Sequence, residues 1–132
     1  MPKFEISTSA RSQLIDITGQ VQKMIADRKM AEGLCHLWVP HTTAGLTVNE
    51  NADPDVAADI LRQLDRMVPW ENGYRHGEGN SAAHVKSSLM GCQLTVAVSG
   101  GRLALGTWQG LYFCEFDGPR RRQVWVEFIP KN

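Results

Sequence analysis

The stretch Gln93-Leu-Thr-Val-Ala-Val-Ser-Gly-Gly-Arg-Leu-Ala-Leu105 indicates the fold class most directly. Its first half alternates larger apolar residues with small or polar ones, as a strand with one buried face does. Gly100-Gly101 favours a tight hairpin turn, so residues 102–105 are expected to return as the next strand. Residues 108–115 and 121–129 have a similar strand-like composition. The last third of the chain therefore predicts an antiparallel sheet.

The first forty residues predict more strands around one helix. Residues 3–9 alternate in polarity, residues 14–17 extend a second strand, and residues 34–39 form a short apolar strand closed by a proline. Between them, Thr18 has the character of a helix N-cap, and the helix is expected to run to about residue 28.

Two helices are predicted in the middle third. Asp53-Pro54 combines a capping carboxylate with a proline in the first turn, and Pro69 stops that helix after an apolar stripe. Residues 81–90 form a second, short helix that Asn80 or Ser81 would cap. The predicted fold is therefore α+β: a single-domain sandwich over residues 1–132, with a mainly antiparallel sheet and two to three helices.

Composition excludes several classes of protein. The 132-residue chain is 42% hydrophobic and has a formal net charge of zero, so no overall basic field attracts nucleic acid or an acidic membrane. No signal peptide or membrane span is expected, and the predicted location is the cytoplasm. Three widely spaced cysteines, Cys35, Cys92 and Cys114, form no metal-binding or redox pair and are expected in the core.

The segment His76-Gly-Glu-Gly-Asn-Ser-Ala-Ala-His84 carries the densest chemistry. Its second half opens the helix at residues 81–90, so backbone N–H groups would point at the same space as the imidazoles. His84 in the first turn is expected to be neutral, as metal binding requires. Lys86 could reach an anionic oxygen from the same turn. The alternative is a capped helix with two solvated histidines.

Two other segments supply further candidates. His41 follows the strand at residues 34–39, where it either serves a site or only hydrogen-bonds its own turn. With His76 and His84 it could form a three-histidine site for a divalent metal, zinc or magnesium. Asn49 and Glu50 precede the helix at Asp53, and Glu50 is a candidate metal ligand, orienting carboxylate or general base.

The C-terminal candidates would bind substrate. Trp108 and Gln109 could form a stacking wall for a planar ligand, although Trp108 could equally belong to the core. Arg120 and Arg122 would share a face and clamp a phosphate or carboxylate, unless they belong to a solvated turn. His36 lies inside a predicted strand and is treated as structural.

These motifs, in this order and spacing, resemble one known family. His41-Thr-Thr-Ala-Gly, Asn49-Glu-Asn-Ala-Asp, Gly79-Asn with His84, Gly106-Thr-Trp-Gln and Asp117-Gly-Pro-Arg are similar to those of the YjbQ-like family, also called secondary thiamine-phosphate synthases. The resemblance covers residues 30–128. It implies an α+β sandwich, a homotrimer with sites near subunit boundaries, a metal or anion site at the histidines, and weak formation of thiamine phosphate from a pyrimidine diphosphate and a thiazole phosphate.

Three functions are consistent with this site. The first is an enzyme that acts on a small phosphorylated heterocycle by metal-assisted diphosphate displacement. The second is a metal-dependent hydrolase of a phosphate ester, lactone or amide, with Glu50 as general base. The third is a trimeric, non-enzymatic protein that binds a phosphorylated metabolite. In the first function, Glu50, His84 and Lys86 are the catalytic candidates, and seven residues would bind substrate: Asn49, Asn80, Ser81, Trp108, Gln109, Arg120 and Arg122.

Overall fold

The computed structural model describes all residues from 1 to 132 and contains three helices and eight strands. In chain order these are β1 (Lys3–Ser7), β2 (Gln13–Asp16), α1 (Thr18–Asp27), β3 (Gly33–Trp38), β4 (Ala44–Glu50), α2 (Pro54–Met67), α3 (Ser81–Met90), β5 (Gln93–Ser99), β6 (Arg102–Leu103), β7 (Gln109–Glu115) and β8 (Arg121–Pro130). The predicted α+β class is confirmed.

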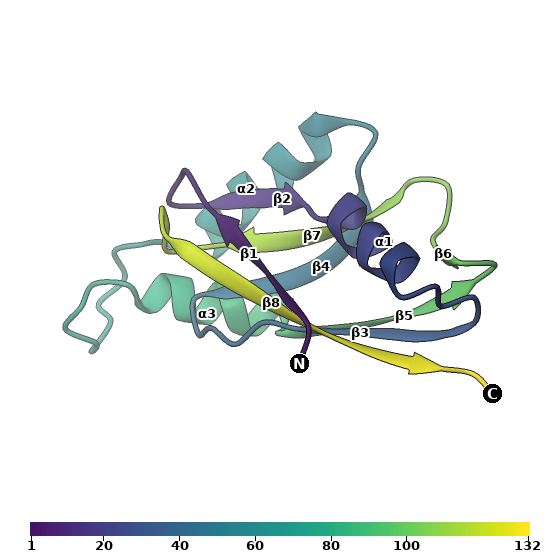
Figure 1. Ribbon diagram of the computed structural model, residues 1–132. Coiled ribbons are helices and arrows are strands. Elements are labelled where there is room, and N and C mark those ends of the chain that lie inside the picture. The colour runs from purple at the N-terminus through teal and green to yellow at the C-terminus, as the bar shows by residue number, and fades with distance from the viewer.

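The strands form two antiparallel sheets that pack face to face (Figure 1). One sheet has the order β1-β8-β3-β5-β6, and the other has the order β2-β7-β4. Inward-facing residues from both sheets and from α1 form the main core, which includes Leu37, Leu46, Phe113 and Val126. The hairpin expected at Gly100-Gly101 joins β5 to β6, where Val98 pairs with Leu103. The sandwich predicted from sequence is therefore present.

Helices α2 and α3 contact the outer face of the smaller sheet. A second apolar cluster forms there around Ala83, Cys114 and Phe116, with Leu61 and Leu64 of α2 packed against it. This cluster explains why β7 is buried along both faces, since it lies between the main core and the helices. No helix of the structure is both long and apolar enough to cross a membrane.

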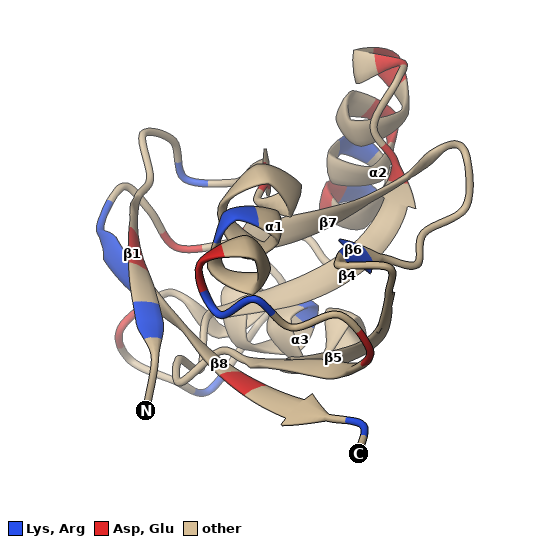
Figure 2. Cartoon of the chain, turned by 45° about the vertical axis from the view of Figure 1, so that its right-hand side comes forward, with Lys and Arg blue, Asp and Glu red and all other residues tan.

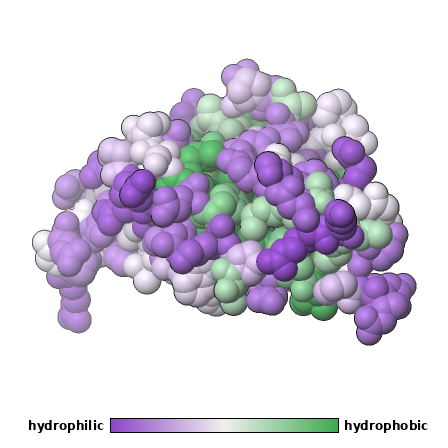
Figure 3. Space-filling model, in the orientation of Figure 1, coloured by the Kyte–Doolittle hydropathy of each residue, from purple (hydrophilic) through white to green (hydrophobic).

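Helix α2 begins where the sequence predicts, because the Asp53 carboxylate accepts a hydrogen bond from the Asp55 N–H at 2.9 Å and Pro54 follows. Its apolar stripe is only partly covered, since no α2 residue is fully buried and Met67 is 60% exposed. Lys and Arg positions are interspersed with Asp and Glu positions along the chain (Figure 2). In Figure 3, hydrophobic patches on the face shown are bordered by hydrophilic residues.

Strand β4 was not predicted. Residues 44–50 look like part of a polar loop because small and polar residues dominate, but they pair with β7 from Ala44 opposite Glu115 to Glu50 opposite Gln109. The neighbouring strand, which is strongly apolar, imposes strand structure on this segment. Asn80 precedes α3 as expected but makes no side-chain capping bond; its amide donates to Asp117 at 2.9 Å.

Candidate functional site

Close packing of α3 against β4 brings His41 and His84 to one end of the sandwich. The Ser87 hydroxyl donates to the Ala44 carbonyl at 2.6 Å, and the Leu46 N–H donates to the Gly91 carbonyl at 3.0 Å. A Cβ added to Gly45 would lie 2.6 Å from the Gly91 oxygen, so only glycine allows this approach. The His41-Thr-Thr-Ala-Gly motif therefore sets the distance between the strand and the helix.

His84 lines two adjoining pockets of about 550 Å³ each. One is shared with His41 and with Thr42, Ser87, Ser88, Gly91 and Cys92. The other is shared with His76 and with Tyr74, Arg75, Ser81 and Val85, and it includes the end of the loop before α3 that projects from the sandwich in Figure 1. We call the two pockets together the histidine groove.

The rings of His76 and His84 contact one another edge to face, with centroids 5.6 Å apart. Arg75 lines the same pocket, and its guanidinium is paired with no carboxylate of the chain. The N–H of Ser81, the first residue of α3, also has no hydrogen-bond partner in the chain, and Ser81 lines the same pocket. This end of the groove thus presents donors and positive charge, which suit an anion.

His41 is held by the backbone of β8. The Gln123 N–H donates to its Nε2 at 2.9 Å. Partial burial lowers the pKa of His41, the charges of Arg122 and Arg120 lower it further, and Glu115 acts in the opposite direction. The imidazole is therefore favoured in its neutral form.

A buried ion pair supports the wall behind His41. Arg122 and Glu115 have side chains that are 3% and 0% exposed, and they are joined by two hydrogen bonds, of which Nε to Oε1 measures 2.8 Å. Arg122 also donates to the Thr43 hydroxyl at 2.8 Å, and the Thr8 hydroxyl donates to Glu115 at 2.8 Å. Burial alone would raise the pKa of Glu115, but these donors outweigh it and hold the pKa below its usual value.

Two basic residues that were predicted to contact a ligand are instead buried in the protein interior. Arg122 faces the interior of the sandwich and not the solvent beside Arg120, because alternation along β8 turns it inward with Val124. Lys86 is also buried, with a side chain that is 1% exposed and paired with Asp65 of α2. Both cations therefore stabilise the scaffold and do not extend into the histidine groove.

Arg120 stays exposed, but its guanidinium is directed to Asp117. Its Nε donates to the Asp117 backbone carbonyl at 2.8 Å, and its Nη2 donates to the Asp117 carboxylate at 3.2 Å. The same carboxylate accepts the Asn80 amide at 2.9 Å. Asn80 Oδ1 is buried without a partner. Asp117 thus links the β7–β8 turn to the start of α3.

The remaining candidates lie at the opposite end of β4. Asn49 and Glu50 end this seven-residue strand, so Glu50 is roughly 20 Å from the His41 end. Gln109 pairs with Glu50, and Trp108 beside it is 62% exposed. Trp108 is therefore not a core residue. Within one chain the predicted site is divided into two groups, which we call the histidine groove and the Glu50 end.

The three histidines do not fit the predicted three-ligand metal site. No group of three or more His, Cys, Asp or Glu side chains is arranged to hold a metal ion. His76 and His84 are adjacent, but the Nε2 lone pair of His41 already accepts the Gln123 amide. Of the three histidines, only His76 and His84 are in contact with one another.

Sequence reasoning missed Arg75 and Glu115. Arg75 is a basic residue directly before the first histidine of the motif, and that adjacency was the available signal. Glu115 closes an apolar strand, seven residues before Arg122 across a turn, so the opposite charges could have indicated a pair.

Two of the three cysteines are core residues: burial raises the pKa of Cys35 to about 11 and of Cys114 to about 12. Cys92 instead lines the groove.

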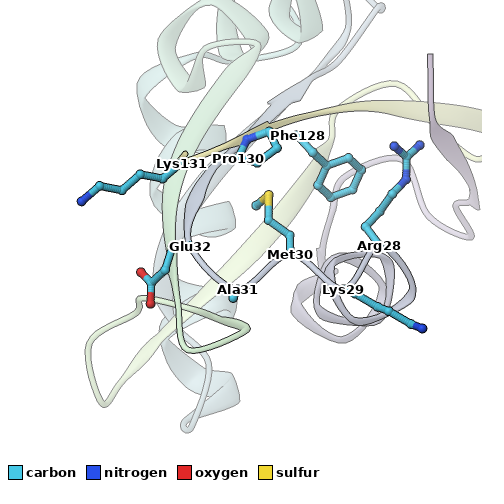
Figure 4. Close-up of a pocket in the computed structure, with 8 residues that line it drawn as sticks. All are labelled: Arg28, Lys29, Met30, Ala31, Glu32, Phe128, Pro130 and Lys131. Carbon is cyan, nitrogen blue, oxygen red and sulfur yellow. The ribbon is translucent and has the colours of Figure 1, made fainter.

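A further pocket of about 470 Å³ lies between the end of α1 and the end of β8 (Figure 4). There the Arg28 guanidinium lies over the Phe128 ring, 4.9 Å from its centroid. The side chains of Lys29 and Lys131 point away from one another, so they form no convergent anion site. None of the predicted site residues lines this pocket.

Comparison with known proteins gives consistent matches along the whole chain. The family model described as "UPF0047 protein YjbQ-like" matches residues 2–131. The UPF0047 protein YugU of Bacillus subtilis is 51% identical over 127 residues, which cover 96% of each chain. A UPF0047 protein of Methanocaldococcus jannaschii is 49% identical over 127 residues, covering 96% of this chain and 92% of its own.

Solved structures agree with the fold. A crystal structure from Clostridium acetobutylicum, described as an uncharacterised conserved protein of the YjbQ/UPF0047 family, has a TM-score of 0.95 and 50% identity, covering 98% of this chain and 100% of that one. A YbjQ-like protein of unknown function from Sulfolobus solfataricus has a TM-score of 0.93 and 29% identity, covering 98% and 96%. The chain therefore belongs to the YjbQ-like UPF0047 family.

Proposed function

We propose that this protein is an enzyme acting on a small phosphorylated heterocycle, with the phosphate or diphosphate bound in the histidine groove. The observation that carries the proposal is the position of His84. It lies in the first turn of α3 and lines both pockets, one with His41 and the other with His76 and Arg75. The unpaired N–H of Ser81 at the start of α3 adds to the attraction for an anion.

The reaction that best uses this arrangement is the one implied by the family resemblance, formation of thiamine phosphate. A thiazole nitrogen would form a bond to the carbon that carries the diphosphate, and pyrophosphate would leave with the electrons of the broken C–O bond. Negative charge then grows on the leaving group. Arg75, His84 and the α3 N-terminus are donors at this end of the groove that would stabilise this charge as it develops.

A divalent cation, if bound, would be held by His76 and His84 and would supply charge neutralisation at the diphosphate. The hydrolase alternative needs Glu50 as a base beside the histidines; within one chain this residue lies at the other end of β4, so this alternative requires Glu50 of a second copy. The binding-protein alternative predicts ligand binding without turnover.

Replacing His84 with Ala is expected to weaken the binding of pyrophosphate about 10- to 100-fold. The reason is that a hydrogen bond to a charged group contributes about 1.5–3 kcal/mol, and each 1.4 kcal/mol is about tenfold in affinity. Isothermal titration of purified protein measures the change. His36→Ala is the control, because His36 lies on β3 and hydrogen-bonds Thr95 away from the groove. Equal affinity in wild type and His84→Ala would contradict the assignment.

We also propose that the protein works as a homotrimer in which the Glu50 end of one copy approaches the histidine groove of the next. The exposed Trp108 and the incompletely covered stripe of α2 support this assembly, since both leave apolar surface without a partner in the single chain. Light scattering is expected to give three times the 14.7 kDa chain mass. A single-chain mass at the concentrations where ligand binds would argue against it.

A further inference from the structure

We infer that His41 serves the groove as a neutral hydrogen-bond donor, through its Nδ1–H, to an anionic oxygen of the ligand, and that it is not a metal ligand. The tautomer of His41 follows from the geometry of its hydrogen bond. The bond to the ligand rests on the proposed function and names the oxygen that His41 would contact.

The hydrogen bond from Gln123 determines the tautomer of His41. A backbone N–H can only donate, so the Nε2 that receives it at 2.9 Å must be unprotonated. In a neutral imidazole the proton then sits on Nδ1. With the Nε2 lone pair engaged and Nδ1 protonated, neither nitrogen offers a lone pair to a metal.

The fold fixes this orientation of the His41 ring. Strand β3 ends at Trp38, opposite Trp125, so β8 extends beyond its partner strand toward Gln123. The imidazole takes the place that a strand carbonyl would otherwise have. Turning the ring over would put a C–H group against the Gln123 N–H and leave that amide without an acceptor.

The charged groups around His41 are already paired. Arg122 is buried beside this segment and donates to both oxygens of Thr43, two residues after His41. Arg120 adds a second guanidinium, and each of the two is paired with a carboxylate, Arg122 with Glu115 and Arg120 with Asp117. The carboxylates of these pairs are therefore not free to bind a metal cation beside His41.

The remaining ring nitrogen of His41, Nδ1, is available to a ligand. His41 lines the pocket of about 550 Å³ that it shares with His84, and its Nδ1 has no hydrogen-bond partner in the chain. A donor without a partner at the wall of a pocket is suited to a phosphate oxygen. The same chemistry would accept a phosphate monoester or free phosphate, so both are used as probes.

Nuclear magnetic resonance of the wild-type protein tests the tautomer without any variant. Long-range ¹H–¹⁵N spectra distinguish the two neutral forms, and coupling through the Gln123 hydrogen bond identifies the His41 ring. The result expected is a protonated Nδ1 and a bare Nε2. A protonated Nε2 would overturn the inference.

A matched pair of substitutions tests the role. His41→Gln can place an acceptor near the Nε2 position but has no donor at Nδ1, whereas His41→Asn can place an amide donor near Nδ1. Titration with inorganic phosphate and with a thiazole phosphate is expected to show about tenfold weaker binding in His41→Gln and a distinctly smaller loss in His41→Asn. If the two variants lose the same affinity, or if His41→Asn loses more than His41→Gln, the donor role is contradicted.

Titration with Co²⁺ gives a separate reading of the metal question. Its affinity is expected to be the same in wild type and His41→Asn, and a clear loss in His41→Asn would make His41 a ligand and overturn the inference. If wild type binds no phosphorylated compound, the proposed function and the ligand part of this inference both fail, and the tautomer and Co²⁺ measurements still decide whether His41 can hold a metal.

Discussion

Replacing Arg122 with Met is expected to lower the free energy of unfolding by about 3–5 kcal/mol. The substitution leaves the Glu115 carboxylate buried and without its cation, and it removes the donor that holds Thr43. Breaking one partner of a buried ion pair is costly because the remaining charge stays desolvated. Urea denaturation followed by tryptophan fluorescence measures the change.

The control for Arg122→Met is Arg121→Ala. Arg121 pairs with Glu5 at 3.8 Å, but both side chains are largely exposed, so its loss is expected to change stability by less than about 1 kcal/mol. The double variant Arg122→Met with Glu115→Gln should recover part of the loss, since no buried charge remains. Equal stability of Arg122→Met and Arg121→Ala would show that the pair is not buried in solution.

The same pair predicts the response to acid. The folded-state pKa of Glu115 lies below its usual 4.5, so the unfolded chain binds more protons as the pH falls through this range. The stabilisation by Glu115 is therefore present above pH 4.5 and is lost as the pH falls toward its folded-state pKa. The slope of stability against pH below 4.5 should be smaller in Glu115→Gln than in wild type.

Replacing Lys86 with Ala is the second change with a large expected effect, a loss of about 3–5 kcal/mol. Lys86 is buried between α3 and α2, where its ammonium pairs with Asp65 and lies 5.2 Å from the centroid of the Trp70 ring. Its removal leaves a cavity and separates Asp65 from its partner. Because Asp65 is half exposed, part of its charge is solvated. The expected loss in the free energy of unfolding therefore lies at the lower end of this range.

Lys23→Ala is the matched control for Lys86→Ala. Lys23 also pairs with an aspartate, Asp27, at 2.7 Å, but both side chains are more than half exposed on α1, and the expected change is about 0.3–0.5 kcal/mol. Thermal unfolding of both variants tests the contrast. If Lys86→Ala unfolds with the wild-type midpoint, the structural role given to this lysine is wrong.

Elements with strong local signals could be predicted from the sequence. The Asp53-Pro54 start of α2 and the Gly100-Gly101 hairpin depend on short-range chemistry, and both are confirmed. Strand β4 could not be predicted, because its residues form a strand only through pairing with β7, which lies about sixty residues away in the chain. Tertiary context decided what local preference left open.

The same limit applies to the site. His76 and His84 are close in sequence, and the structure brings their rings together as the motif suggested. Lys86 and Arg122 look like available cations in the sequence, and only the packing of distant acids against them shows that they are buried. Glu50 is only nine positions from His41 in the sequence, yet a full strand separates the two. Patterns therefore identified the residue types, but not their partners.

Pyrophosphate release from the two thiamine precursors decides whether the histidine groove carries the proposed reaction. Purified wild type and His84→Ala are incubated with the pyrimidine diphosphate and the thiazole phosphate, with and without added zinc or magnesium, and products are followed by ³¹P NMR. We expect pyrophosphate and thiamine phosphate in equal amounts from wild type and far slower formation by His84→Ala. Equal rates in the two proteins, or no product from wild type under any condition, would contradict it.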